Sequence, residues 1–196
     1  MAEGFFPLVA YCALMSGTPG PNNVMLATSG ANFGYRRTLP HLLGIVAGSA
    51  ALTATVCMGL GEVFARFPQV HGALKAVGSL YLVYLAWKLA GASLAQPGQA
   101  GRPMSFVEGA AFQIVNPKTW MKAGTLATVF MPTRLGPVQG ALLVSVIGAF
   151  VALPLVSMWA LFGVGIRRFL DSPLRLRLFN GAMGASLLVL AVGLLR

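Results

Sequence analysis

Long apolar segments of this chain are interrupted near their middles by short stretches rich in proline and asparagine, and this happens twice. The first stretch is Thr18-Pro19-Gly20-Pro21-Asn22-Asn23, and the second is Asn116-Pro117-Lys118-Thr119. A proline inside a helix removes a backbone hydrogen bond and clashes with the preceding turn. In hydrocarbon, the freed backbone groups must be satisfied within the protein or by a ligand. The two stretches therefore predict two broken membrane helices, an arrangement typical of a transport site.

The composition is that of an integral membrane protein. Of the 196 residues, 57% are hydrophobic and only 9% are charged, whereas soluble domains carry about 25% charged residues. The net charge of +10 does not indicate nucleic-acid binding, because the basic residues lie at the ends of apolar blocks. Basic residues in such positions report membrane orientation and contact with anionic lipid.

Six apolar segments are long enough to cross a bilayer, which takes about 20 helical residues. They cover residues 5–29, 38–64, 70–92, 106–131, 136–165 and 175–195. We therefore expect one all-α polytopic membrane domain over residues 1–196. A polar stretch divides it into a first repeat over about 1–92, a linker over about 93–105 and a second repeat over about 106–196.

Each half has an odd number of spans, so the second half enters the membrane from the opposite side. If the halves share a fold, they form two inverted three-helix repeats, each with a broken first helix. Pro21 then corresponds to Pro117. Chance similarity is the alternative, because glycine and proline are common in membrane helices.

The basic residues predict the orientation. Alternating spans assign Arg36, Arg37, Lys88, Arg102, Arg167, Arg168, Arg175 and Arg177 to one side, and Arg66, Lys75, Arg134 and Arg196 to the other. Cytoplasmic loops carry an excess of Lys and Arg, so the first side is predicted to be cytoplasmic. Both termini then lie outside, and the linker lies in the cytoplasm.

Each break offers groups that suit the charged ends of an amino acid. Pro21 and Pro117 suit the first position of a helix, which Thr18 or Asn116 would cap. A helix start favours a carboxylate, and the carbonyls of the helix that ends before the break suit an ammonium group. The candidate substrate-binding residues are Thr18, Pro19, Gly20, Pro21, Asn22, Asn23, Asn116, Pro117, Lys118 and Thr119.

Several of these side chains also have a purely structural interpretation. Asn22 and Asn23 either bind substrate or satisfy backbone groups freed by the prolines. Asn116 either binds substrate or only caps the following helix. Lys118 either neutralises a carboxylate, or loses its proton during the cycle, or extends toward a membrane interface.

Two further residues of the same span are weaker candidates. Lys122, one helical turn after Lys118, either extends a basic path or reaches toward the interface. Glu108, about two to three turns from Lys118, is the acid best placed for proton coupling. All four acids (Glu3, Glu62, Glu108, Asp171) and both histidines (His41, His71) lie near span ends and are expected at the interfaces.

Other kinds of chemistry have less support. Cys12 and Cys57 lie in separate spans without a CxxC pair, so a membrane thiol–disulfide electron carrier is retained only as the alternative hypothesis. A metal site would need clustered carboxylates, histidines or thiolates. A nucleophilic enzyme would need a base near Ser16 or Ser29. We expect no enzymatic activity, metal or cofactor.

Several motifs are similar to those of a known family. Thr18-Pro19-Gly20-Pro21-Asn22-Asn23, Phe33-Gly34-Tyr35-Arg36-Arg37 and Leu43-Gly44-Ile45-Val46-Ala47-Gly48 resemble the opening signature of the LysE/RhtB amino-acid exporters. The second half adds Phe112 and Val115-Asn116-Pro117-Lys118. Tyr84-Leu85-Ala86-Trp87-Lys88 and Pro103-Met104-Ser105-Phe106 resemble the branch that exports cysteine and O-acetylserine.

The resemblance, which covers essentially the whole chain, implies a multi-pass exporter in the bacterial inner membrane. Its substrate would be a neutral amino acid or derivative, such as cysteine, O-acetylserine, threonine or homoserine, exported by antiport with protons as the coupling ion. Membrane lipid is the other expected partner. Glycine pairs such as Gly44 and Gly48 allow close helix contacts either between halves or between protomers, so a homo-oligomer is left open.

Overall fold

The computed structural model describes residues 2–60, 66, 68–94, 101–170 and 172–195, and the regular elements of this part of the chain are all helices. They are α1 (Ala2–Gly17), α2 (Pro21–Phe33), α3 (Tyr35–Thr55), the π-helical turn η1 (Val56–Leu60), α5 (Pro68–Leu94), α6 (Phe106–Val115), α7 (Pro117–Val129), α8 (Pro137–Arg167) and α9 (Pro173–Leu195). The prediction of an all-α chain is confirmed. Five of these helices begin with a proline, whose missing N–H costs nothing at the first helical position.

Both predicted helix breaks are present. Residues 18–20 separate α1 from α2, and Gly20 has extended backbone with φ −178° and ψ 175°. The second break is the single residue Asn116, with φ −87° and ψ 109°, between α6 and α7. Pro40 in α3 and Pro154 in α8, by contrast, lie inside continuous helices.

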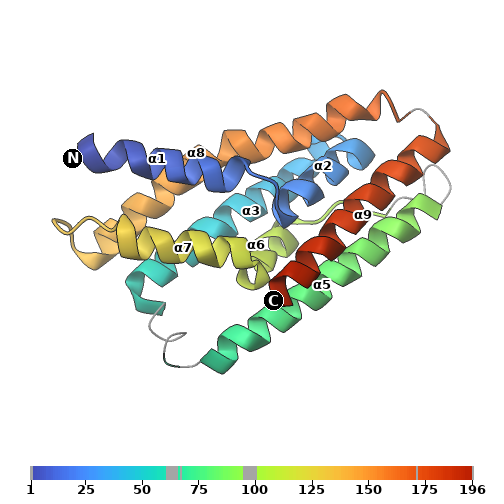
Figure 1. The fold of residues 1–196 in the computed structure, drawn as a ribbon. Helices are drawn as coiled ribbons and strands as arrows, with labels where there is room; N and C mark the ends of the chain where they lie inside the picture. Colours follow the sequence, from blue (N-terminus) through green and yellow to red (C-terminus); the bar gives the residue numbers. More distant parts are fainter. Residues whose placement is uncertain (1, 61–65, 67, 95–100, 171, 196) are drawn as a thin grey trace.

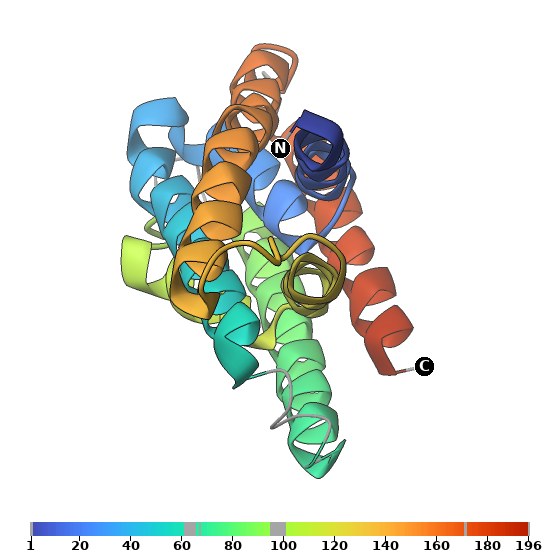
Figure 2. The same cartoon turned by 90° about the vertical axis from the view of Figure 1, so that its left-hand side faces the viewer.

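The helices form an elongated bundle in which segments far apart in the sequence lie side by side (Figure 1). α5 packs along α9, α2 packs against α8, and α3 packs against both α6 and α8. The N-terminus and the loop before α8 lie at one end, whereas the α2–α3 and α8–α9 connections lie at the other. Figure 2 shows α1 and α7 nearly end-on, with α5 and α9 crossing them steeply.

Glycines bring helices of the two halves into backbone contact. A Cβ at Gly44 of α3 would clash with the backbone of Phe106 at the start of α6. A Cβ at Gly163 of α8 would clash with the backbone of Ala27 in α2, and Gly30 of α2 meets the backbone of α8 in the same way. These small residues therefore join the two halves within one chain.

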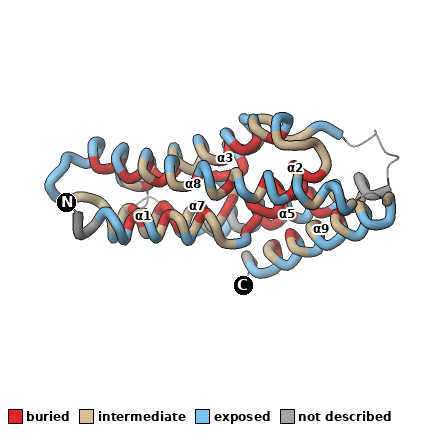
Figure 3. Tube along the Cα trace, turned by 90° about the horizontal axis from the view of Figure 1, so that it is seen from above, coloured by how far each residue is buried: buried red, intermediate tan, exposed pale blue. Residues whose placement is uncertain are grey.

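Three helices of the described residues are long and apolar enough to cross a membrane by length and composition, namely Tyr35–Gly59, Pro137–Arg167 and Pro173–Gly193. Shorter apolar helices cover Phe5–Gly17, Ala76–Leu89 and Phe106–Val115. Buried residues follow the inner faces of the helices, and exposed residues follow the outer faces (Figure 3). Large apolar side chains such as Phe6, Trp87 and Phe150 are among the exposed ones, as expected where lipid replaces water around the protein.

His41 is buried between α3 and α6, and its expected interfacial position stays a prediction. Its side chain is only 1% exposed, because Gly109 lets α6 approach the backbone and ring of His41 in α3. The side chains of Glu3, Glu62, His71 and Asp171 lie outside the described part of the chain, so their interfacial positions stay predictions.

Candidate functional site

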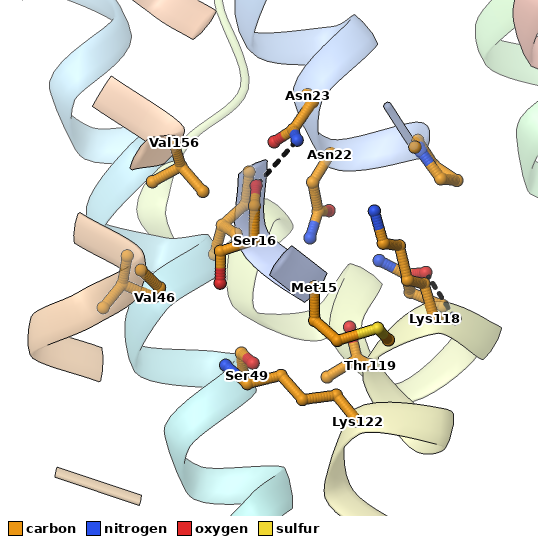
Figure 4. A pocket seen from close by; sticks show the side chains of 15 residues that line it. Met15, Ser16, Asn22, Asn23, Val46, Ser49, Lys118, Thr119, Lys122 and Val156 are labelled. Atoms are coloured by element: carbon orange, nitrogen blue, oxygen red, sulfur yellow. Dashed lines mark hydrogen bonds between the residues drawn. The ribbon is translucent and has the colours of Figure 1, made fainter. Parts of the chain in front are cut away.

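The two breaks meet in one small pocket inside the bundle (Figure 4). Its volume is about 50 Å³, which is room for a few water molecules. Its wall includes the predicted residues Gly20, Pro21, Asn22, Asn23, Asn116, Lys118, Thr119 and Lys122, together with Met15, Ser16, Ile45, Val46, Ser49, Ala152 and Val156. Thr18, Pro19 and Pro117 lie in the adjoining turns. The structure thus gathers the predicted residues of both breaks, which are about one hundred positions apart in the sequence.

At the first break, side chains from other parts of the chain satisfy the last carbonyls of α1. Asn23 Nδ2 donates to the carbonyl oxygens of Ser16 and Thr18, both at 2.8 Å. Trp159 Nε1 of α8 donates to the Gly17 carbonyl at 3.0 Å. Because free carbonyls are costly away from water, these bonds stabilise the break. The side chain of Asn23 therefore satisfies backbone groups at the break, which is one of the two roles that the sequence allowed.

Thr18 does not cap α2, contrary to the prediction. Its Oγ1 donates back to the Leu14 carbonyl at 2.8 Å, within the last turn of α1. A threonine at a helix end readily bonds the carbonyl four residues earlier. The N-cap of α2 is instead Gly20, which has no side chain to offer.

Lys118 extends from the second break to the first. Its Nζ donates to the carbonyl oxygens of Thr18 at 2.7 Å and Pro19 at 3.2 Å, and to Thr18 Oγ1 at 2.8 Å. A Cβ at Gly20 would lie 3.2 Å from this Nζ, so the small residue makes room for it. The carbonyls of the first break therefore bind an ammonium group, as predicted, but this group is the side chain of Lys118 and not part of a substrate.

The second break is stabilised by the side chain of Asn116, the residue that forms it. Asn116 is 1% exposed, and its Oδ1 accepts a hydrogen bond from the backbone N–H of Lys118 at 3.1 Å. This bond caps α7, as predicted. Trp120 Nε1, one turn into α7, donates to the Ile114 carbonyl of α6 at 2.7 Å. Both bonds come from residues within one turn of the break.

Gln113, a residue that was not among the predicted ones, connects the two breaks. It is fully buried in α6, and its Oε1 accepts from Asn22 Nδ2 at 2.9 Å and from Thr119 Oγ1 at 2.8 Å. Its Nε2 donates to Asn22 Oδ1 at 3.1 Å and to the Gly109 carbonyl at 2.9 Å. The available signal in the sequence was an amide side chain three residues before Asn116 in an otherwise apolar segment.

Lys122 is buried but unpaired. It is 7% exposed and lines the pocket, where a Cβ at Gly148 of α8 would lie 3.5 Å from its Nζ. No hydrogen bond or ion pair to this Nζ is found within the described residues. Its side chain runs across the pocket toward α3 (Figure 4). Lys122 therefore ends inside the bundle.

Glu108 does not reach the pocket. Its carboxylate accepts hydrogen bonds from two nitrogens of Arg102, at 2.6 and 2.8 Å, and from the backbone N–H of Ser105 at 2.7 Å. Ser105 and Glu108 form the capping box that begins α6. The hydrogen bond to Glu108 raises the pKa of Arg102 above its usual range. The structure thus places Glu108 at a helix start, away from Lys118.

A larger cavity lies at the opposite end of α1. It has a volume of about 850 Å³ and lies between the start of α1, the loop after α7 and the first turns of α8. Phe5, Phe130 and Leu143 are typical of its apolar wall, to which Arg134 adds a charge. Its described lining contains none of the predicted site residues, so their polar chemistry belongs to the smaller pocket.

Both cysteines are free thiols, Cys12 buried and Cys57 partly buried. They belong to one apolar cluster with Leu8, Leu126 and Val144. A free cysteine in such a cluster behaves as a small hydrophobic residue, which gives the electron-carrier alternative no added support.

Comparison with known proteins identifies the family of this chain. The family model described as LysE type translocator matches residues 13–196, which include the whole pocket. The cysteine/O-acetylserine efflux proteins of Escherichia coli strain K12, Shigella sonnei strain Ss046 and Shigella flexneri are each 29% identical to this chain over 154 residues, 78% of either protein. No solved structure matches the chain. The chain therefore belongs to the LysE family of translocators.

Proposed function

We propose that this chain exports small neutral amino acids or their derivatives, such as cysteine, O-acetylserine, threonine or homoserine, across the bacterial inner membrane. One observation carries the proposal: two broken helices bring their ends and two lysines into one pocket inside a bundle of apolar helices. In transporters, broken helices of this kind form the substrate site. The names of the efflux relatives support the substrate class.

The proposal includes six membrane crossings in two inverted repeats, over about 1–92 and 106–196. The α1–α2 pair then corresponds to α6–α7, α3 to α8, and α5 to α9. Under this exchange, the packing of α2 on α8 becomes that of α7 on α3, and the packing of α1 on α8 becomes that of α6 on α3. All four contacts are present, and this repeated pattern supports the inverted repeat.

The proposed orientation rests on one basic end of the bundle. Arg36 and Arg37 follow the α2–α3 connection, and Arg167 and Arg168 precede the α8–α9 connection at the same end. The excess of positive charge supports a cytoplasmic location for this end and an outside location for both termini. Reporter fusions should place residue 98 in the cytoplasm and the C-terminus outside. A cytoplasmic C-terminus would contradict the proposed orientation.

The proton gradient is the proposed driving force, by antiport. Among the described residues, the pocket wall contains lysines but no carboxylate, so a lysine or the substrate itself carries the coupled proton. A protonophore added to exporting cells should abolish the efflux. Efflux that continues at the same rate would exclude this driving force while leaving export itself intact.

A substrate panel tests the function directly. Cells with and without the protein are loaded with each of the four proposed substrates and with lysine and arginine, and efflux is measured per inserted protein. We expect faster efflux of at least one neutral compound. The variant with Cys12→Ser and Cys57→Ser should export as wild type does, since neither thiol lines the pocket. Export of none of the panel would refute the function, and loss of export in the cysteine variant at normal membrane levels would favour the electron carrier.

A further inference from the structure

The donor groups of the pocket divide into those that are already bonded and those that are free. Lys118 uses its ammonium on the first break, and Asn22 exchanges two side-chain hydrogen bonds with Gln113. Within the described residues, the free donors include the Lys122 ammonium, the hydroxyls of Ser16 and Ser49, and the backbone N–H groups of Asn22 and Asn23. All of these residues line the same pocket.

The unpaired ammonium of Lys122 is costly to keep inside a membrane protein. Insertion scales assign about 2.5–3.5 kcal/mol to a lysine at the centre of a membrane helix. The ion pair found among the described residues joins Arg102 to Glu108 at the start of α6, and it gives Lys122 no counter-charge. A buried lysine is normally either paired or neutral, so an ammonium group at this position would take its counter-charge from a ligand.

The start of α2 supplies a second set of free donors. Gly20 offers no side-chain cap and Pro21 has no N–H, so Asn22 and Asn23 present the first backbone N–H groups of the helix. These groups and the helix dipole favour an anion. The start of α7 differs, because Asn116 already caps it.

We propose that Lys122, with the backbone N–H groups of Asn22 and Asn23, binds the carboxylate of the transported amino acid, whereas Lys118 fastens the second break to the first. This inference rests on the proposed function. An ammonium group has three donors, and those of Lys118 bond Thr18 and Pro19. A carboxylate would have to displace these bonds to reach Lys118, but it would find Lys122 free.

The lysine charges of the pocket also restrict which side chains a substrate can have. The pocket wall contains the ammonium groups of Lys118 and Lys122 and, among the described residues, no carboxylate. Like charges repel strongly where water is scarce, so the pocket disfavours cationic side chains. The substrate class is therefore a small amino acid that has a free carboxylate and no positively charged side chain.

Transport by the purified protein in liposomes tests the role of Lys122. The probes are the neutral amino acid that the wild type transports fastest and its amide, which lacks the carboxylate. Wild type should prefer the acid by about tenfold or more in kcat/KM, and Lys122→Met should reduce that preference to about one by raising KM for the acid. Lys118→Met should transport more slowly but keep the preference. Lys88→Met changes an exposed lysine of α5 and should match wild type.

Thermal unfolding separates a binding role from a structural one. Lys122→Met removes an uncompensated buried charge, so the substrate-free variant should unfold at the temperature of wild type or higher. The neutral amino acid should raise the unfolding temperature of wild type but not that of the variant. Lys122→Arg keeps the charge and should keep part of both the acid preference and the stabilisation.

Two results would overturn the inference without touching export itself. One is a Lys122→Met protein that still prefers the acid, and the other is a substrate-free Lys122→Met protein that unfolds at a lower temperature than wild type. If wild type transports none of the panel, the export function fails instead. Acetate then tests the carboxylate site by itself: it should stabilise wild type more than acetamide does and leave Lys122→Met unchanged, and equal stabilisation by both probes would refute the site.

Discussion

The two helix breaks differ in what holds them together. The first spans residues 18–20, and its carbonyls are bonded by Asn23, Trp159 and Lys118, the last two from the other half of the chain. The second is the single residue Asn116, and the bonds at that residue come from within one turn. The second break is therefore locally determined, whereas the first depends on tertiary contacts and leaves a helix start uncapped.

This difference gives the two breaks different roles: the second is structural, whereas the first leaves backbone donors that a ligand can use. At the start of α7, Asn116 accepts hydrogen bonds from the N–H groups of Lys118, Thr119 and Trp120. The uncapped start of α2 keeps its first N–H groups available for a ligand. Gln113 stands between the two breaks, because it bonds Asn22 on one side and Thr119 on the other. Three substitutions test whether the breaks respond as differently as their bonding indicates.

The largest effect is expected for Gln113→Ala. The change leaves Asn22, Thr119 and the Gly109 carbonyl without their partner, and each buried unsatisfied group costs about 1–3 kcal/mol. The free energy of unfolding should therefore fall by about 3 kcal/mol or more, measured by thermal unfolding in detergent. Gln139→Ala, at an exposed glutamine of α8, should stay within about 0.5 kcal/mol of wild type. A Gln113→Ala protein as stable as this control would show that the two breaks are not connected through Gln113.

Lys118→Met should have an intermediate and local effect. It deprives the Pro19 carbonyl and Thr18 Oγ1 of their donor, but Asn23 still bonds the Thr18 carbonyl. Hydrogen exchange of amides at residues 14–24 should accelerate by about tenfold, equivalent to about 1.4 kcal/mol of local stability. Lys88→Met is the matched control. Unchanged amide exchange at residues 14–24 in Lys118→Met would mean that the first break is stable without the bonds from Lys118.

The smallest effect is expected for Asn116→Ala, which removes the cap of α7. Loss of such a cap costs about 1 kcal/mol, so amide exchange should accelerate in the first turn of α7 and remain unchanged in α2. Asn116→Asp keeps an acceptor oxygen and should behave like wild type. Faster exchange in α2 upon Asn116→Ala would contradict the local character of the second break.

The positions of both breaks could be predicted from the sequence, because each places proline beside asparagine in an apolar segment. The proline removes a donor, and the asparagine supplies a polar side chain for the freed backbone groups. Pro40 and Pro154 lie inside continuous helices, which shows that one proline alone does not decide the outcome. The Asn116 cap was predictable for the same local reason, whereas the bond from Thr18 to Leu14 depended on a choice between two nearby partners.

The different roles of Lys118 and Lys122 could not be predicted from local sequence. Both lie on one face of α7, one turn apart, and both have the same chemistry. Lys118 donates hydrogen bonds to carbonyls about one hundred residues earlier in the chain, whereas Lys122 lies against α8 at Gly148. Only the tertiary fold specifies these neighbours, and the burial of His41 against Gly109 depends on the fold in the same way.

The glycine contacts also determine which helices can move as units. α2 and α8 touch through backbone at Gly30 and Gly163, and α3 touches α6 at Gly44. Helices that interlock this closely cannot slide or separate without opening voids, because packed interiors resist continuous deformation. Each pair takes one helix from each half of the sequence. We therefore expect the bodies that move in a transport cycle to be composites of both halves, and the chain passes from one pair to the other at Gly34, between α2 and α3.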